Sequence, residues 1–273
     1  MCVCSSICLV LDTKSRKKML SSWLGGLLCI SLTVIVGVLG VRLVRKLVPI
    51  DILQRTNEIA APLHAAISVI YAVLLAFVVI IVWEQYNQAE EAVDSEANSL
   101  IALERSTNFF PDSVRFLAHD KIKAYCQSVV GTEWPLFERD KYERYQSKQY
   151  KELWQMIGSI KLANDRDQSW LQLQLAYQQL NAIDIARNRR FLYVESNVPP
   201  VMWVLLIFGA LVTILFTAFF GVEHRFTHSL MVGLLSAIIG FMLFMILAID
   251  NPFVGIVRVE PEAFRHVIEQ FQK

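Results

Sequence analysis

The sequence predicts an all-α integral membrane protein with four transmembrane helices and a helical cytoplasmic insertion between the second and the third. Hydrophobic residues make up 55% of the 273 residues, and a mean hydropathy of +0.42 is too high for an ordinary soluble domain. Four segments without internal charges approach the roughly 20 residues that a spanning helix needs. They are 20–41, 62–83, 201–221 and 229–249.

These four segments are expected to be helical, because only a helix bonds every backbone group within one segment in hydrocarbon. Pro62 and Pro199-Pro200 fit helix starts, where a missing N–H removes no hydrogen bond. The spans divide the chain into an N-terminal tail, a first pair of spans, the insertion, a second pair of spans and a C-terminal tail. The corresponding ranges are 1–19, 20–83, 84–200, 201–249 and 250–273.

The basic residues that flank the spans predict the orientation of the chain. Nine lie on the side of both termini and the insertion, and five lie on the opposite side. Because cytoplasmic loops carry the excess of Lys and Arg, we expect cytoplasmic termini and a cytoplasmic insertion. The basic cluster before the first span is not followed by a cleavage pattern, which predicts an uncleaved anchor. The sequence leaves the translation start open between Met1 and Met19.

The insertion has a helical pattern throughout. Its first helix is expected to continue from the second span, since Tyr86, Ala89 and Val93 recur at helical spacing. A second helix is expected to start at Pro111 with Asp112 as its cap and to break by Gly131. An irregular stretch is predicted from residue 133, and further helices are predicted over 142–157 and 170–193.

Composition and motifs exclude several classes of function. A net charge of +1 gives no support to a nucleic-acid partner, and five unevenly placed cysteines predict no disulfide framework. No phosphate-binding loop, dinucleotide fingerprint, zinc-protease motif or serine elbow occurs in the chain. We therefore expect no enzyme, no cofactor and no metal site, and membrane lipid as a partner.

Polar and aromatic residues line one face of the second span. Two interpretations are open, because polar side chains in a membrane face either protein or water. Small residues and Tyr71 suit packing against a neighbouring helix, whereas a ring of such helices suits a pore. The stripe comprises His64, Ser68, Tyr71, Leu75, Val78, Val82 and Gln85.

Arg187 and Arg190 stand three residues apart near the membrane end of the last insertion helix. Two explanations apply to them. Basic residues commonly flank cytoplasmic span ends, and exposed arginines also raise the local concentration of anions. The second explanation makes them candidates for an anion-attracting vestibule.

An ordered set of motifs over about residues 20–265 resembles the bestrophin-like family, bacterial membrane proteins of undefined function, and this resemblance implies a bacterial inner membrane. The resemblance rests on the run from His64 to Glu96-Ala97 with Trp83-Glu84-Gln85-Tyr86, on Glu133-Trp134-Pro135, on Arg187 to Arg190 and on Asp250-Asn251-Pro252-Phe253-Val254-Gly255. The comparison with bestrophins implies a pentameric anion channel with four spans, cytoplasmic termini and a helical cytoplasmic part. Calcium gating is not implied, because the acidic cluster that follows the fourth span in bestrophins has no counterpart near Glu260 and Glu262.

In bestrophins the second span lines a narrow apolar neck with bulky residues about one turn apart. Carried over by position, this implies Ile67, Tyr71, Leu75 and Val79, or the neighbouring stripe. The combined pore-lining candidates are His64, Ile67, Ser68, Tyr71, Leu75, Val78, Val79 and Val82.

The leading hypothesis is a symmetric homo-oligomeric ion channel, with small inorganic anions as its cargo and the second span around its axis. The alternative hypothesis is a membrane-anchored scaffold or sensor that does not conduct and whose insertion helices bind a partner. An axial opening would favour the channel, and an axis filled with packed side chains would favour the scaffold.

Overall fold

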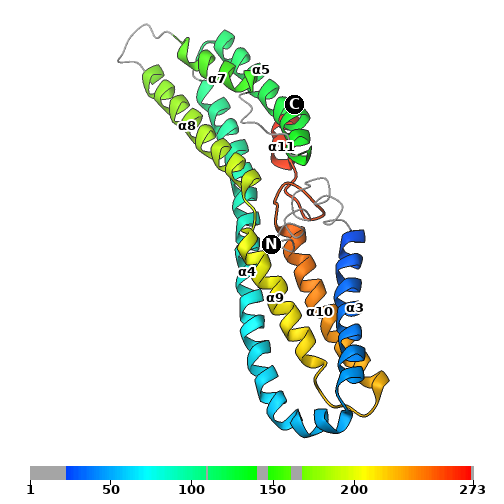
Figure 1. Cartoon of the computed structure of the whole chain (residues 1–273). Helices are drawn as coiled ribbons and strands as arrows, with labels where there is room; N and C mark the ends of the chain where they lie inside the picture. The colour runs from blue at the N-terminus through cyan, green and yellow to red at the C-terminus, as the bar shows by residue number, and fades with distance from the viewer. Residues whose placement is uncertain (1–22, 109, 140–146, 161–167, 272–273) are drawn as a thin grey trace, which may run out of the picture. The chain divides into compact units, whose positions relative to one another are not determined.

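The computed structural model describes residues 23–108, 110–139, 147–160 and 168–271, and these residues form helices without a strand (Figure 1). The expected N-terminal tail and the start of the first expected span lie outside these ranges. The helices are α3 (Trp23–Leu47), α4 (Ile50–Thr107), α5 (Asp112–Ser128), the π-helix η1 (Val129–Glu133), α6 (Trp134–Arg139), α7 (Lys148–Gly158), α8 (Gln168–Glu195), α9 (Pro200–Thr217), α10 (Arg225–Ile249) and α11 (Glu262–Gln270).

The chain forms two compact units, and α4 contributes to both. Unit 1 contains the described residues up to Glu84 together with Asn197–Asn251 and Gly255–Val257. Unit 2 contains Gln85–Ser196, Pro252–Val254 and the described residues from Arg258 onward. The C-terminal segment therefore belongs to the folded part of unit 2.

Among the described residues, four helices are long and apolar enough to cross a membrane: α3, α4, α9 and α10. Large apolar side chains such as Ile70, Phe208 and Phe226 lie on their outer surfaces. Such surfaces suit lipid, which is as apolar as these side chains. The helical character that the sequence predicts for the apolar segments is confirmed.

The prediction that a helix starts at Pro62 is wrong. Helix α4 begins at Ile50, and Pro62 lies inside it. A proline in a helix removes one backbone hydrogen bond, but a long membrane helix tolerates this loss where its surroundings satisfy the freed carbonyl. The prediction at Pro199-Pro200 is confirmed, since Pro199 caps α9 and Pro200 is its first residue.

Helices α3 and α10 lie side by side through small residues (Figure 1). A Cβ atom added at Gly240 would stand 3.1 Å from the Cα atom of Ile30, and one added at Gly26 would meet the ring of Phe244. Gly37 similarly faces Val232. Because dispersion forces between close backbones hold membrane helices together, these glycines allow the close approach that the helix pair needs.

The link between α9 and α10 is anchored to the start of α4. The side-chain amide of Asn57 donates to the carbonyl of Gly221 at 3.2 Å and accepts from the amide of Gly221 at 2.9 Å. A Cβ atom at Gly221 would stand 2.6 Å from the carbonyl carbon of Leu53. Position 221 therefore accepts no side chain unless α4 moves.

We expect Gly221→Ala to destabilise unit 1 by about 1–3 kcal/mol, because overpacking against backbone forces α4 to shift. The thermal unfolding midpoint of the detergent-solubilised protein measures this effect. Gly233→Ala is the matched control, since its added Cβ would meet only ordinary van der Waals neighbours at 3.8 and 4.0 Å. Equal midpoints for the two variants would contradict the proposed close approach.

Unit 2 is a helical assembly around one buried cluster that includes Leu100, Tyr125, Phe137 and Phe253. The expected helix over 170–193 is confirmed by α8, and α7 overlaps the one expected over 142–157, whose first residues lie outside the described ranges. The predicted cap at Asp112 is wrong, because Pro111 occupies the cap position and Asp112 pairs with Arg115.

The predicted break by Gly131 and the irregular stretch after it are also wrong. The chain continues from α5 through η1 into α6. A π-turn accommodates one extra residue per turn, and Pro135 lies in the first turn of α6. Local glycine and proline signals therefore did not interrupt the helical path.

Candidate functional site

The stripe that the sequence singles out on the second span packs against the chain's own α9. The hydroxyl of Tyr71 donates to the carbonyl of Leu206 at 3.1 Å, and a Cβ atom at Gly209 would meet the Tyr71 ring. The ring of His64 stacks on Phe216 with centroids 5.5 Å apart. These contacts match the packing interpretation of the stripe.

None of the eight pore-lining candidates is fully exposed in the single chain. Tyr71, Val78 and Val82 are buried, and the other five are half-buried: His64, Ile67, Ser68, Leu75 and Val79. A side chain that lines a pore must reach the axis. The buried three therefore face the interior of unit 1.

The opposite face of α4 is exposed and apolar. At 100° per residue, Ile80 lies opposite Tyr71 and Val73 lies close to the same direction. Val69, Val73, Phe77 and Ile80 are 63%, 50%, 62% and 62% exposed. These bulky residues recur at intervals of three and four, so they form one surface about a turn apart. We call it the outer face of α4.

Arg187 and Arg190 lie in the interior of unit 2 and not on a surface. Arg190 donates to both oxygens of Glu96, at 2.8 and 3.1 Å, and to Glu133 at 2.9 Å. Arg187 binds both oxygens of Glu133, at 3.0 and 2.7 Å. The two carboxylates are 0% and 1% exposed. Paired and buried charges of this kind do not provide the free positive charge that an anion-attracting vestibule needs.

Tyr125 links the two halves of this buried charge network, which we define as Glu96, Tyr125, Glu133, Arg187 and Arg190. Its hydroxyl donates to Glu96 and accepts from Arg187. Burial raises the pKa of Tyr125 well above its ordinary value, so the hydroxyl keeps its proton. Burial alone would lower the pKa of Arg190, but the charges of Glu96 and Glu133 outweigh burial and raise it.

Aromatic rings enclose the guanidinium of Arg190. Its carbon lies 5.3 Å from the centroid of Phe137, 5.5 Å from that of Trp134 and 5.6 Å from that of Phe264. The Nη1 atom has no hydrogen-bond partner in the described part of the chain. The negative faces of the rings attract the cation and offset part of this loss.

The motifs that carried the family resemblance meet at this network. Glu133 belongs to it at the end of η1, Trp134 adjoins it at the start of α6, and the ring of Trp134 meets Phe253 edge-on at 5.7 Å. The indole N–H donates to the carbonyl of Val259 at 3.3 Å. Motifs that are far apart in the sequence thus form one core. The sequence analysis quoted Glu96 only as part of a family motif and missed both its pairing with Arg190 and the role of Tyr125, although an acidic residue among the regularly spaced apolar residues of 89–100 was a signal.

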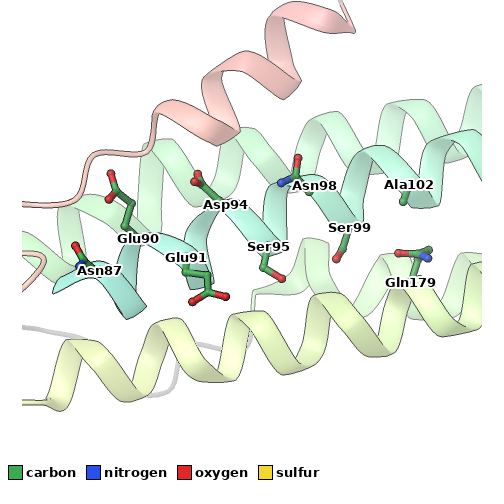
Figure 2. A pocket seen from close by; sticks show the side chains of 9 residues that line it. All are labelled: Asn87, Glu90, Glu91, Asp94, Ser95, Asn98, Ser99, Ala102 and Gln179. Carbon is green, nitrogen blue, oxygen red and sulfur yellow. The ribbon is translucent and has the colours of Figure 1, made fainter. Parts of the chain in front are cut away.

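An open groove of about 640 Å³ lies along the part of α4 that belongs to unit 2 (Figure 2). Figure 2 shows its residues projecting from α4, with Gln179 reaching toward them from α8. The lining residues are Asn87, Glu90, Glu91, Asp94, Ser95, Asn98, Ser99, Ala102 and Gln179. We call it the acidic groove, because it contains three carboxylates and no basic residue.

We expect Glu133→Gln to destabilise unit 2 by about 3–5 kcal/mol, because it leaves buried guanidinium charge without its partner. Two readouts are a lower unfolding midpoint and faster alkylation of Cys126, whose thiol is fully buried and whose pKa burial raises. Arg189→Ala changes an exposed neighbour and should leave both unchanged. An unaltered midpoint in Glu133→Gln would refute the importance of the network.

Comparisons with known proteins agree with this architecture. A structure of a membrane protein variant has a TM-score of 0.62 at 13% identity and covers 90% of this chain and 97% of its own. A variant of a bacterial bestrophin homologue from Klebsiella pneumoniae has a TM-score of 0.62 at 14% identity, covering 90% and 96%. A structure of that homologue solved by Zn-SAD phasing has a TM-score of 0.60 with the same identity and coverage.

At these identities the structural matches show a shared fold. A search of curated proteins finds no match. The bestrophin-like domain, however, matches residues 31–264, which is most of the chain, and so confirms the resemblance that the motifs indicated. The protein is an all-helical integral membrane protein that belongs to the bestrophin-like family.

Proposed function

We propose that this protein is a symmetric homo-oligomeric ion channel in which α4 surrounds the central axis. Membership of a family that includes ion channels supports a channel. The outer face of α4 is the observation that carries the proposal, because the described part of the chain leaves this continuous row of bulky apolar side chains exposed.

The pore is lined by the outer face of α4, with Val69, Val73, Phe77 and Ile80 forming its neck. This assignment replaces the stripe that contains Tyr71, because that stripe packs against α9. Bulky apolar rings about a turn apart form a hydrophobic constriction, which gates conduction by excluding water. None of the four neck residues can trap a permeating ion by charge.

The proposed channel has five subunits and lies in a bacterial inner membrane, with the insertion and both termini in the cytoplasm. The family resemblance supports the pentamer, and the distribution of basic residues around the spans supports the orientation. A heterologous contact repeated around a closed ring brings one α4 from each copy to the axis.

One of the arguments for an anionic permeant ion, the positive charge of Arg187 and Arg190, no longer applies. Arg187 and Arg190 are paired with Glu133 and Glu96, and so their fields largely cancel outside unit 2. The family resemblance still favours small inorganic anions. The proposed function is therefore ion conduction, with small inorganic anions as the cargo that the resemblance favours.

We expect the reconstituted protein to conduct ions across planar bilayers and Val73→Cys to make the current sensitive to a charged methanethiosulfonate reagent. A charged adduct at the neck blocks ions, because it narrows a hydrophobic constriction. Leu75→Cys is the matched control on the stripe side of α4, where packing within the chain restricts access. Wild-type protein treated in the same way controls for the native cysteines.

If the reagent reduced the current of Leu75→Cys and not that of Val73→Cys, the pore lining would be assigned to the stripe that contains Tyr71. A stable oligomer without current in any salt would contradict the channel and favour the scaffold or sensor. A subunit count by mass spectrometry of the detergent-solubilised protein tests the pentamer separately.

A further inference from the structure

The link between α9 and α10, residues 218–224, is held in place by side chains from two other helices of unit 1. Asn57 of α4 bonds both the amide and the carbonyl of Gly221. The Nη2 atom of Arg45, in the last turn of α3, donates to the carbonyl of Val222. These hydrogen bonds to neighbouring backbone groups fix the path of the link.

A buried histidine contacts the same guanidinium. His228 lies in the first turn of α10 and is only 2% exposed. Its Nε2 atom is 3.0 Å from the carbonyl oxygen of Thr217 at the end of α9, and its Nδ1 atom is 3.3 Å from Nη2 of Arg45. A carbonyl only accepts hydrogen bonds and a guanidinium only donates them. These partners therefore assign the neutral tautomer of His228, with its proton on Nε2 and its Nδ1 lone pair toward Arg45.

Protonation of His228 is incompatible with this arrangement. The imidazolium keeps its bond to Thr217, because Nε2 donates in both forms, but it gains a second proton on Nδ1. Two positively charged donors then face each other across 3.3 Å in a buried site, where charges are weakly screened. A guanidinium is not deprotonated in proteins, so one of the two side chains must move. Movement of Arg45 breaks its bond to Val222, and movement of His228 breaks its bond to Thr217.

In the described part of the chain, no acidic side chain pairs with His228 to compensate its added charge. Helix α9 contains no titratable side chain. The other histidine of unit 1 outside the link region, His64, contacts Phe216 and Phe220 through its ring. The charged and titratable residues near this site on α3, at the start of α4, in the link and on α10 are exposed: Arg42, Lys46, Asp51, Arg55, Glu58, Glu223, His224 and Arg225.

We propose that Arg45 and His228 form a pH-sensitive latch, which holds the α9–α10 link at neutral pH and releases it in acid. A histidine in water takes up a proton near about pH 6.5. The open link admits this proton and the closed latch excludes it, so the closed form loses stability as the pH falls below about 6.5. In the orientation proposed above, the link lies outside the cytoplasm and the latch responds to the pH there. The latch itself does not depend on that orientation.

Hydrogen–deuterium exchange of the full-length protein in detergent tests the latch without any need for conduction. The amide of Gly221 donates to Asn57 at 2.9 Å, so its protection reports the closed link once the intrinsic pH dependence of amide exchange is corrected for. Lowering the pH from about 7.5 to about 5.5 should reduce this protection about tenfold, because each pH unit below the ordinary pKa of histidine favours the protonated open form tenfold. Unchanged protection would overturn the proposal.

His228→Gln tests the assignment of the proton to His228, because an amide side chain forms hydrogen bonds but does not titrate. Protection of Gly221 in this variant should be the same at both pH values. His224→Gln is the matched control, since His224 is exposed and occupies the cap position of α10, and His64→Gln is a second control. Both controls should keep the wild-type response. A response that persists in His228→Gln, or that disappears in either control, would overturn the proposal.

Arg45→Met provides an independent test that does not require His228→Gln to fold. Methionine keeps an unbranched apolar side chain and removes the charge that opposes protonation of His228. Protection of Gly221 should fall at neutral pH, because the bond to Val222 is lost, and acid should reduce it further by less than about threefold. Lys46→Met is the matched control at an exposed neighbour and should keep the wild-type protection and response. The full wild-type response in Arg45→Met would refute the role of Arg45 in the latch.

Discussion

Burying the guanidinium of Arg190 imposes the constraint on which the rest of unit 2 depends. An unpaired cation in a protein core costs several kcal/mol, so the fold must bring acceptors to it from elsewhere in the chain. Glu96 comes from α4 and Glu133 from the end of η1. The π-turn at η1 is therefore part of the electrostatic arrangement, because it ends at the residue that pairs with both arginines.

The aromatic residues around this network complete the same arrangement. Rings from α6, α8 and α11 enclose the guanidinium, and the edge-on contact between Trp134 and Phe253 ties the segment after α10 to them. One buried cation thus connects elements from most of the chain's length. That accounts for the motifs of the family being short, ordered and widely separated, since each provides one wall or one partner.

Hydropathy predicted the apolar helices because a membrane requires long uncharged segments, and this requirement is local in the sequence. The partners of Arg187 and Arg190 could not be predicted in this way, since Glu133 and Glu96 lie 54 and 94 residues away from them. Basic residues near a span end look the same in sequence whether they are exposed or paired. Likewise, the Tyr71 stripe indicated contact with another part of a protein, but the sequence alone does not show that this part is α9 of the same chain.

Helix α4 is uninterrupted over 58 residues, so the direction in which each of its side chains points is fixed by its position in the sequence. Each residue turns a helix by about 100°, so Tyr71 faces the core of unit 1 and Ile80 faces away from it only at a fixed spacing in the sequence. Gaining or losing one residue between Tyr71 and Ile80 would turn the two side chains out of opposition without changing either of them. A change of seven residues would nearly restore the alignment. Spacing along this helix therefore determines which side chains face the core as much as the residues themselves do.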